Sequence, residues 1–585
     1  MSQPRPEHPR PQFRRDRWLN LNGEWDFALD FGASGEDRGW PSGPSGWTDR
    51  ITVPFCPESR LSGIGHTDFM PAVWYHRTLE IPSAWQGMRI LLHFGAVDYD
   101  CRAWVNGTLA GRHRGGSSSF VFDITPLLED DGNHLVVSAS DDVRSGLQPR
   151  GKQSPSLHSH GCVYTRTTGI WQTVWLEAVP ATSLEHVRIV PDLDGRRFVL
   201  TPTLRRASRG LELRATLLEG ERTVTSARTP AASGASLVLD VDDPHPWSCD
   251  DPHLYDLRLE LTRDGEIVDQ VASYAGLRKF HIERNCFYLN DEPIFLRLVL
   301  DQGFYPEGGW TAPTDDELKA DVVRSQAVGF NGARLHQKVF EERFHYWADR
   351  LGYLTWGEFC DWGMDFSKPQ AVLNHQREWG DIVRRDVNHP SIVAWTAFNE
   401  TGGGTEAHDQ ALEGAYHLTR ALDPTRPAHD TSGYVHVKTD IFTVHDYDQD
   451  PQTFRERYAS VDPARPEEAR VCAEDRSVPY EGQPYVVDEY GGTWWVGGSG
   501  DAGTDRDEGW GYGQRPTSLE EVYDRIERLT AALTEHPHIA GYCYTQLTDV
   551  EQEQNGIYTF DRRDKFDAQR LKRAFGSPAA IESRV

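Results

Sequence analysis

The sequence is short of basic residues and of long apolar runs, and both shortages narrow the possible functions. Its 585 residues carry 61 Lys and Arg against 89 Asp and Glu, a net charge of -28. No dense basic stretch follows the N-terminal tail, so we expect neither nucleic acid nor a membrane as a partner. No apolar run approaches the roughly 18 residues of a membrane helix, and the N-terminus lacks the apolar core of a leader peptide. We therefore expect a protein that is made and kept in the cytoplasm.

The eight cysteines lack the spacing of a metal site or of a disulfide framework. They are scattered along the chain, with no CxxC pair and no Cys/His ligand pattern. Reduced and mostly buried thiols are the default for such a pattern. The sequence thus signals neither a zinc site nor a secreted disulfide scaffold.

Short alternating strands dominate the first half of the chain. Residues 1–182 contain strand patterns such as Arg89–Phe94 and His134–Ala139, separated by turn signals such as Asn106-Gly107. This pattern predicts a jelly-roll β-sandwich. Residues 183–280 repeat it on a smaller scale, which predicts a second, immunoglobulin-like sandwich.

The hydrophobic period changes after Phe287, where apolar runs begin to alternate with helical patterns. Thr314 is placed to cap a helix that ends near Gly329, and Ser391–Phe398 is a continuous apolar run of strand length. Over residues 281–585 this alternation predicts one (β/α)8 barrel. A doubly wound sheet is the alternative fold, but no Gly-rich phosphate turn follows the first strand.

Two of the barrel strands are followed by glutamates. The run Ser391–Phe398 leads into Asn399 and Glu400, and Pro484-Tyr-Val-Val-Asp leads into Glu489. Active sites of such barrels lie at the C-terminal ends of the strands. Glycoside cleavage with retention needs one carboxyl as acid and a second as nucleophile, about 5 to 5.5 Å apart. The pattern therefore favours a retaining glycosidase.

The motif Asp386-Val-Asn-His-Pro-Ser-Ile-Val-Ala-Trp-Thr-Ala-Phe-Asn-Glu400 resembles the acid/base signature of family 2 of the glycoside hydrolases, the β-galactosidase and β-glucuronidase family. Asn331–His336 and Glu489-Tyr-Gly-Gly are similar to its second-strand and nucleophile motifs. The two sandwich regions also resemble this family, in segments such as Trp18–Trp25 and Thr168–Gln172. The resemblance implies sandwich, sandwich and barrel in that order.

The resemblance also implies a role for each motif residue. Glu400 is expected to be the general acid/base, and Glu489 the nucleophile, kept ionised by donors such as Arg334 and Tyr447. Asn399 is expected to bind the sugar 2-hydroxyl. Further sugar contacts are expected from the following residues at strand ends or nearby loops: His336, His445, Glu358, Trp494, Tyr544 and Asp301.

Three departures from the family bear on the sugar. Asp301 follows the first strand where many relatives have His, so a sugar hydroxyl there would meet a hydrogen-bond acceptor instead of a His ring. No Asp or Glu occurs from Arg144 to Arg166, where large galactosidases carry a carboxylate that binds sugar and a cation. Glu553-Gln-Asn555 replaces the Asn-x-Lys of glucuronidases. We therefore expect no metal or other cofactor and disfavour a glucuronidase.

The working hypothesis is an exo-hydrolase that removes a neutral terminal sugar from an oligosaccharide or glycoside, in the manner of a β-galactosidase. A β-D-galactofuranosidase and an α-L-arabinofuranosidase are alternatives on the same machinery. A catalytically inactive carbohydrate-binding protein and a transglycosidase are the rivals from other classes. A homo-oligomer is possible in each case.

Overall fold

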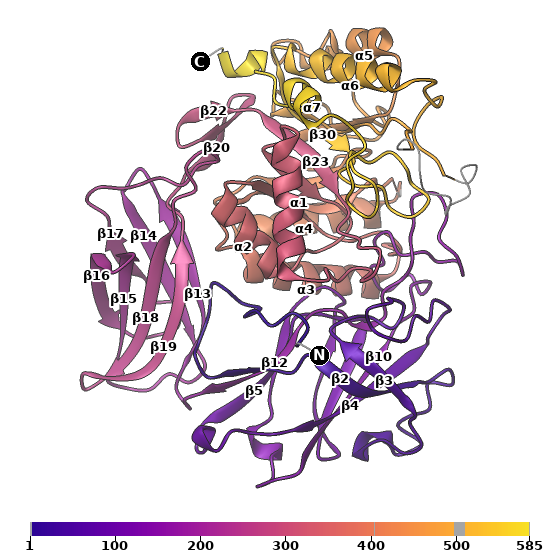
Figure 1. Cartoon of the computed structure of the whole chain (residues 1–585). Helices are drawn as coiled ribbons and strands as arrows, with labels where there is room; N and C mark the ends of the chain where they lie inside the picture. The colour runs from indigo at the N-terminus through magenta and orange to yellow at the C-terminus, as the bar shows by residue number, and fades with distance from the viewer. Residues whose placement is uncertain (1–2, 403, 497–508, 584–585) are drawn as a thin grey trace.

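The computed structural model describes residues 3–402, 404–496 and 509–583, and folds them into two β-sandwiches followed by a barrel (Figure 1). The predicted fold class is confirmed. The predicted limit at 182/183 lies between two strands, whereas the limit at 280/281 lies inside the strand Phe280–Glu283. Both exact limits stay predictions. None of the helices in the described ranges has the length and apolar composition needed to cross a bilayer.

The first sandwich pairs a four-stranded with a six-stranded antiparallel sheet. The first sheet has the order β1-β12-β5-β9 and the second the order β3-β2-β4-β10-β7-β8, with a short β6-β11 ladder beside them. The strands are β1 Trp18–Asn20, β2 Gly23–Leu29, β3 Asp49–Val53, β4 Ala72–Leu79, β5 Arg89–Phe94, β6 Val97–Asp98, β7 Asp100–Val105, β8 Thr108–Arg114, β9 Phe120–Asp123, β10 Asn133–Ser140, β11 Gly169–Ile170 and β12 Val174–Val179. Their alternating apolar residues form one buried core.

The second sandwich is smaller and pairs sheets of the order β13-β14-β17 and β16-β15-β18-β19. A three-stranded sheet, β20-β21-β22, then leads to the barrel. The strands are β13 Leu184–Asp192, β14 Arg197–Leu204, β15 Leu211–Glu219, β16 Arg222–Pro230, β17 Leu237–Asp240, β18 Tyr255–Arg263, β19 Glu266–Ala275, β20 Phe280–Glu283, β21 Cys286–Leu289 and β22 Glu292–Ile294.

The barrel is an eight-stranded, all-parallel sheet of order β27-β26-β25-β24-β23-β30-β29-β28, whose end strands β27 and β28 lie side by side. The strands are β23 Leu296–Asp301, β24 Gly332–Leu335, β25 Leu354–Glu358, β26 Ile392–Asn399, β27 Ala428–Ser432, β28 Phe442–Asp446, β29 Tyr485–Gly491 and β30 Ile539–Thr545. The helices are α1 Asp315–Ala327, α2 Glu342–Leu351, α3 Pro369–Asp386, α4 Glu406–Leu422, α5 Pro451–Tyr458, α6 Leu519–Thr534 and α7 Ala568–Phe575.

Local sequence explains where several of these elements begin. The Thr314 hydroxyl accepts the backbone N–H of Glu317 and so caps α1, and Ser518 caps α6 in the same way. Every residue of β26 is buried, as a strand packed on both faces requires. These features place Asn399 and Glu400 at a fixed point above the barrel.

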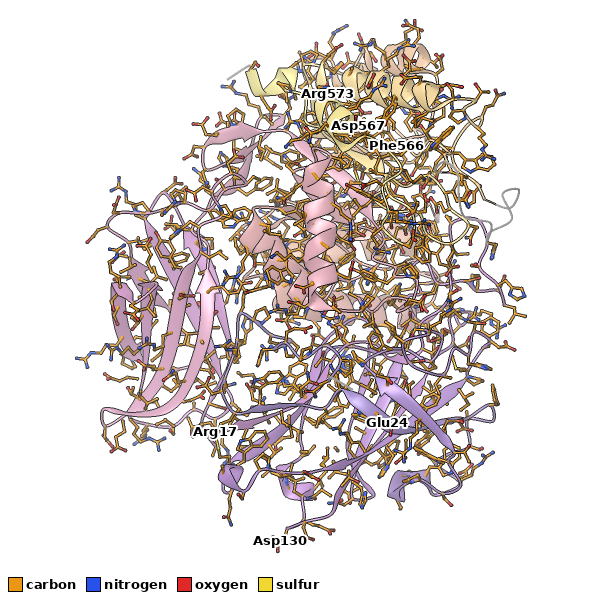
Figure 2. All side chains as sticks on the ribbon, viewed as in Figure 1. Arg17, Glu24, Asp130, Phe566, Asp567 and Arg573 are labelled. Carbon is orange, nitrogen blue, oxygen red and sulfur yellow. The ribbon has the colours of Figure 1, made fainter. Side chains whose placement is uncertain are left out.

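The first sandwich packs against the loops at the C-terminal ends of the barrel strands. The N–H of Arg150 donates to the carbonyl of Trp362 at 2.8 Å, and the N–H of Gly151 donates to that of Cys360 at 3.1 Å. Side chains fill the space between the domains, from Glu24 in the first sandwich to Phe566 near α7 at the other end of the molecule (Figure 2). The site above the barrel is therefore built by two domains.

Candidate active site

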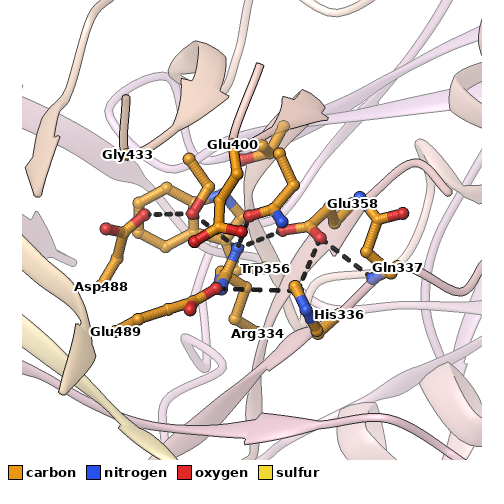
Figure 3. A network of polar contacts seen from close by, with 12 residues as sticks. Arg334, His336, Gln337, Trp356, Glu358, Glu400, Gly433, Asp488 and Glu489 are labelled. Atoms are coloured by element: carbon orange, nitrogen blue, oxygen red, sulfur yellow. Dashed lines mark hydrogen bonds and ion pairs between the residues drawn. The ribbon is translucent and has the colours of Figure 1, made fainter. Parts of the chain in front are cut away.

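Glu400 and Glu489 come together at the C-terminal ends of β26 and β29 (Figure 3). One carboxylate oxygen of each lies within 4.8 Å of the other. Glu400 has a backbone φ of 48°, a value that residues other than glycine rarely adopt. Such strain costs about 1–3 kcal/mol and concentrates at functional sites. The backbone thus holds the Glu400 carboxylate over the barrel mouth.

Arg334, at the end of β24, is the fully buried centre of the site. Its guanidinium donates to Glu489 Oε1, to Glu358 Oε2 at 2.5 Å and to Ser432 Oγ at 2.6 Å. It also donates to Asn399 Oδ1 at 3.2 Å. Because a guanidinium is always charged, Arg334 supplies a permanent cation beneath both glutamates.

Glu489 is held ionised by its neighbours. Its second oxygen, Oε2, accepts from the Tyr447 hydroxyl, and the His445 ring lies 3.4 Å away. Burial would raise the pKa of Glu489, but the charges of His445 and Arg334 outweigh it and hold that pKa far below its usual range. Tyr447 remains a neutral donor because burial, with the Glu489 charge, raises its own pKa well above the ordinary value.

His445, in β28, links the two glutamates. Its Nδ1 donates to Glu400 Oε1 at 2.8 Å, and its Nε2 lies 2.9 Å from Ser432 Oγ and 3.4 Å from Asp488 Oδ1. Burial opposes the charged form, but Glu489 and Asp488 raise the pKa of His445 to about 9. The imidazolium therefore carries a proton on both nitrogens at neutral pH.

Three other predicted residues lie around the same centre. The Asn399 side chain is fully buried, and its Nδ2 has no partner within the described residues, which leaves that donor for a ligand. Glu358 accepts from Arg334 and from the Gln337 N–H at 2.9 Å. His336 Nδ1 lies 3.0 Å from Glu358 Oε1, and burial lowers the pKa of His336 well below its ordinary value, so its ring is neutral.

Asp301 does not lie in this group, contrary to the expectation from sequence. Its Oδ1 accepts the N–H of Gly303 at 2.9 Å. Burial and the neighbouring Asp321 of α1 raise its pKa to about 6, with Arg562 and Lys338 also nearby. The carboxyl group therefore lies between the barrel and α1, because the alternation of side chains along β23 directs it away from the barrel interior.

Tyr544 also lies outside the site. Its buried ring packs edge-on against Tyr490 and Phe575, with ring centroids at 5.4 and 5.0 Å, in the core between the barrel and α7. A contact between Tyr544 and sugar is therefore not expected. Trp494 lies half-buried beside Arg515, whose guanidinium is 4.8 Å from its ring centroid, and its contact with sugar stays a prediction.

Sequence reasoning missed three residues of the site. Tyr512 stacks on Tyr447 with ring centroids 3.4 Å apart, and Trp362 donates from Nε1 to the Asn399 carbonyl at 3.1 Å. Lys152, from the first sandwich, lies over the Trp362 ring at 4.2 Å. The loops that carry these three residues are far apart in the sequence and meet only in the fold. The motif Glu553-Gln-Asn555 was the one feature near them that the sequence analysis identified.

The cluster Glu400, His445 and Glu489 is compact enough to hold a metal ion by distance alone. While His445 is protonated it has no lone pair to offer a metal. Its two N–H groups instead face Glu400 and Ser432. The arrangement fits acid/base and nucleophilic chemistry by the carboxyl groups themselves.

Known proteins are similar to this chain over about two thirds of its length. The chain is 25% identical over 431 residues to a putative β-glucuronidase of Formosa agariphila, which covers 70% of this chain and 50% of that protein. It is 25% identical over 401 residues to a β-galactosidase of Thermoanaerobacter pseudethanolicus, which covers 65% of this chain and 51% of that protein. It thus spans about half the length of these two relatives.

The fold is also that of solved structures. The crystal structure of the β-glucuronidase of Ruminococcus gnavus superimposes with a TM-score of 0.81 at 19% identity, covering 99% of this chain and 100% of that one. Sequence profiles of the glycosyl hydrolases family 2 match here in chain order, as the sugar binding domain at 19–176, the central domain at 182–278 and the TIM barrel domain at 280–502. The chain belongs to glycosyl hydrolase family 2.

Proposed function

We propose that this protein is a retaining exo-glycosidase that removes a neutral terminal sugar by double displacement. The observation that carries the proposal is the separation of Glu400 and Glu489, whose nearest oxygens lie within 4.8 Å. Retaining enzymes place the two carboxyl groups about 5–5.5 Å apart, whereas inverting enzymes leave about 6.5–9.5 Å for a water molecule. The spacing supports attack by the enzyme itself.

In the first step Glu489 attacks the anomeric carbon while Glu400 gives its proton to the glycosidic oxygen. The bond from the anomeric carbon to that oxygen breaks, and the aglycone leaves as an alcohol. Glu489 suits the nucleophile role because Arg334 and Tyr447 hold it ionised and oriented. The free Asn399 amide group would bind the sugar 2-hydroxyl, a contact that strengthens in the transition state.

In the second step water attacks the anomeric carbon of the glycosyl-enzyme intermediate. Glu400 takes a proton from this water, the bond from the anomeric carbon to Glu489 breaks, and the sugar leaves with its configuration retained. Glu400 keeps side-chain exposure of 21% against 5% for Glu489. This difference suits a group that exchanges protons with solvent beside one that must stay ionised.

The charges around the site support a neutral sugar. Carboxylates outnumber cations there even with Glu400 protonated, as the members of the two sets show: Glu358, Asp488, Glu489 and Glu553 against Lys152, Arg334 and His445. A uronate would add another negative charge to this excess. Repulsion between like charges disfavours that addition. Galactose or arabinose, as pyranoside or furanoside, adds none.

The test is a panel of 4-nitrophenyl glycosides, with β-D-galactopyranoside, β-D-galactofuranoside, α-L-arabinofuranoside and β-D-glucuronide. We expect one of the three neutral substrates to be cleaved, and Glu489→Gln to abolish turnover. Glu400→Ala should retain the first step with good leaving groups and gain rate with added azide, because azide needs no base. Cleavage of the glucuronide alone would overturn the neutral sugar. Equal loss in both variants without azide rescue would overturn the roles.

A further inference from the structure

Lys152 differs from the other buried lysines of the described residues. Lys338 donates to the carbonyls of Gly303 and Trp310 at 2.6 and 2.7 Å, and Lys565 donates to Asp549 at 2.8 Å. Lys152 is 7% exposed, yet its ammonium has no hydrogen bond or ion pair within the described part of the chain. The ammonium lies over the Trp362 ring at 4.2 Å, and its hydrogen-bond donors are left available to a ligand at the barrel mouth.

The loop that carries Lys152 is fixed on both sides. Arg150 and Gly151 are bonded through their N–H groups to the barrel loop at Cys360 and Trp362. On the other side, the buried Gln153 side chain donates to Asp98 Oδ2 at 2.8 Å and accepts the N–H of Thr167 at 2.8 Å. The Lys152 stem is therefore held over the barrel mouth, and little order is lost when a ligand binds.

The electrostatic neighbours of Lys152 are the groups of the candidate site. Burial would lower the pKa of Lys152, but Cys162 and then the carboxylates Glu553, Glu400 and Glu489 raise it. Lys152 in turn lowers the pKa of His336. The ammonium is thus charged and within electrostatic reach of both proposed catalytic carboxylates.

Glu553, an electrostatic neighbour of Lys152, belongs to a closed ring of hydrogen bonds. Its Oε2 accepts from the Tyr164 hydroxyl and its Oε1 from Asn555 at 3.0 Å. Gln546 donates to Asn555 at 2.8 Å, and Gln302 donates both to Gln546 at 2.8 Å and to the Tyr164 hydroxyl at 2.9 Å. The ring fixes a carboxylate acceptor near the ammonium donor.

We propose that Lys152 is a specificity-determining residue that donates a hydrogen bond to a hydroxyl oxygen of the terminal sugar, with Glu553 as the neighbouring acceptor. This inference rests on the proposed function, because the ligand is the sugar cleaved between Glu400 and Glu489. A cationic donor and a carboxylate acceptor at the mouth of one site suit the hydroxyl groups of a neutral sugar. A carboxylate at this place would meet the Glu553 charge.

The test compares Lys152→Met with the wild type on the neutral 4-nitrophenyl glycoside that the panel selects and on its monodeoxy analogues. We expect kcat/KM to fall about 10- to 100-fold for the parent glycoside, the range of a hydrogen bond from a charged donor. For one deoxy analogue the loss should nearly vanish, because the hydroxyl that Lys152 binds is already missing. Losses that multiply independently at every position would overturn the proposal.

Lys338→Met is the matched control, a buried lysine with carbonyl partners outside the site. We expect it to lower the melting temperature without changing the ratio of kcat/KM between the parent and any deoxy glycoside. Lys152→Met should show the opposite pattern, with a changed ratio and a melting temperature within a few degrees of the wild type. A changed ratio in neither variant would mean that Lys152 does not bind the sugar.

Two further measurements separate the possible failures. A 2-deoxy-2-fluoro glycosyl fluoride of the same sugar should label Glu489 in the wild type, as read by intact mass. Without labelling and without turnover, the proposed function fails. With labelling but no coupling between Lys152 and a hydroxyl, only the present inference fails. A 4-nitrophenyl uronide could be cleaved faster than its neutral parent, with this preference lost in Lys152→Met. That result would overturn the proposal, because Lys152 would then bind a sugar carboxylate and not a hydroxyl.

Discussion

His445 is the residue at which the charges of the site meet. It lies 2.8 Å from Glu400 and 3.4 Å from Glu489, with Asp488 on its other nitrogen. Glu489 and Asp488 raise its pKa to about 9 despite burial, whereas an unfolded chain leaves histidine near 6.5. The folded protein therefore holds a proton here that the unfolded chain releases at neutral pH.

This proton makes the stability of the fold depend on pH. The contribution of His445 is complete below pH 6.5 and is lost as the pH rises through about 9. We expect the stability advantage of the wild type over His445→Gln to shrink by about 2–3 kcal/mol across that window. Chemical denaturation at several pH values measures it. Parallel curves for the two proteins would contradict a raised pKa at His445.

At the same scale, sequence predicted the centre of the site better than its edges. The motif residues Arg334, Asn399, Glu400 and Glu489 lie together because strand ends converge in a barrel. Asp301 was expected to join them and does not, because side chains alternate in direction along β23 and that of Asp301 points away from the barrel interior. Lys152 was missed because its neighbours belong to another domain.

Among the elements, the segment Arg150–Gln153 has the most demanding backbone. Gly151 has a φ of 53°, and a Cβ atom there would lie 2.2 Å from the Gln337 carbonyl oxygen. Gly161, farther along the same connection, also has a φ of 53°, but a Cβ atom would meet nothing within 4 Å. The two glycines therefore share one conformation and differ only in their surroundings.

Alanine at these two glycines separates backbone strain from displacement of the segment. We expect Gly161→Ala to cost about 1 kcal/mol or less of stability and to leave kcat/KM close to the wild type. Gly151→Ala should push the segment off the barrel loop and lower kcat/KM at least 10-fold, because Lys152 moves with it. Melting temperatures and kcat/KM for both variants measure this. Similar kcat/KM values for the two would show that the close contact has no role in catalysis.

Strongly patterned elements were predicted well, and polar ones were not. β5 begins and ends where the alternating pattern predicted, and the continuous apolar run of β26 was identified within one residue at each end. The strands β27 and β28 were not predicted, because their sequences are Ala-His-Asp-Thr-Ser and Phe-Thr-Val-His-Asp. Polar residues fill these strands where they line the site, so the apolar signal of a strand is absent.

For the molecule as a whole, Arg15 joins the two sandwiches. It donates to Asp269 of β19 with two bonds of 2.9 Å, to Glu177 of β12 at 3.1 Å and to the Leu184 carbonyl at 2.6 Å. All of these side chains are buried. Burial would raise the pKa of Glu177, but the Arg15 charge outweighs it and holds that pKa well below 4.5. The junction therefore depends on both charges.

Removing this cation should weaken the whole molecule. Arg15→Met leaves two buried carboxylates without their partner, and we expect a loss of about 3–5 kcal/mol, read as a lower melting temperature. The stabilisation by ionised Glu177 is present above about pH 4.5 and is lost as the pH falls, so acid unfolding should begin at a higher pH in the variant. Arg17→Met, at an exposed position labelled in Figure 2, is the control and should match the wild type. Equal acid midpoints in all three proteins would contradict the role of Arg15.

The hydrogen-bonded ring through Tyr164 and Glu553 crosses the boundary between the first sandwich and the barrel. Under the proposals above, bond cleavage belongs to Glu400 and Glu489 of the barrel alone. Sugar recognition is shared between the barrel, through Asn399 and Glu553, and the sandwich, through Lys152. Mutations in the sandwich loop can then change the sugar specificity of the enzyme while its reaction stays the same. Exchange of that loop between relatives would transfer preference for a sugar without transferring the catalyst.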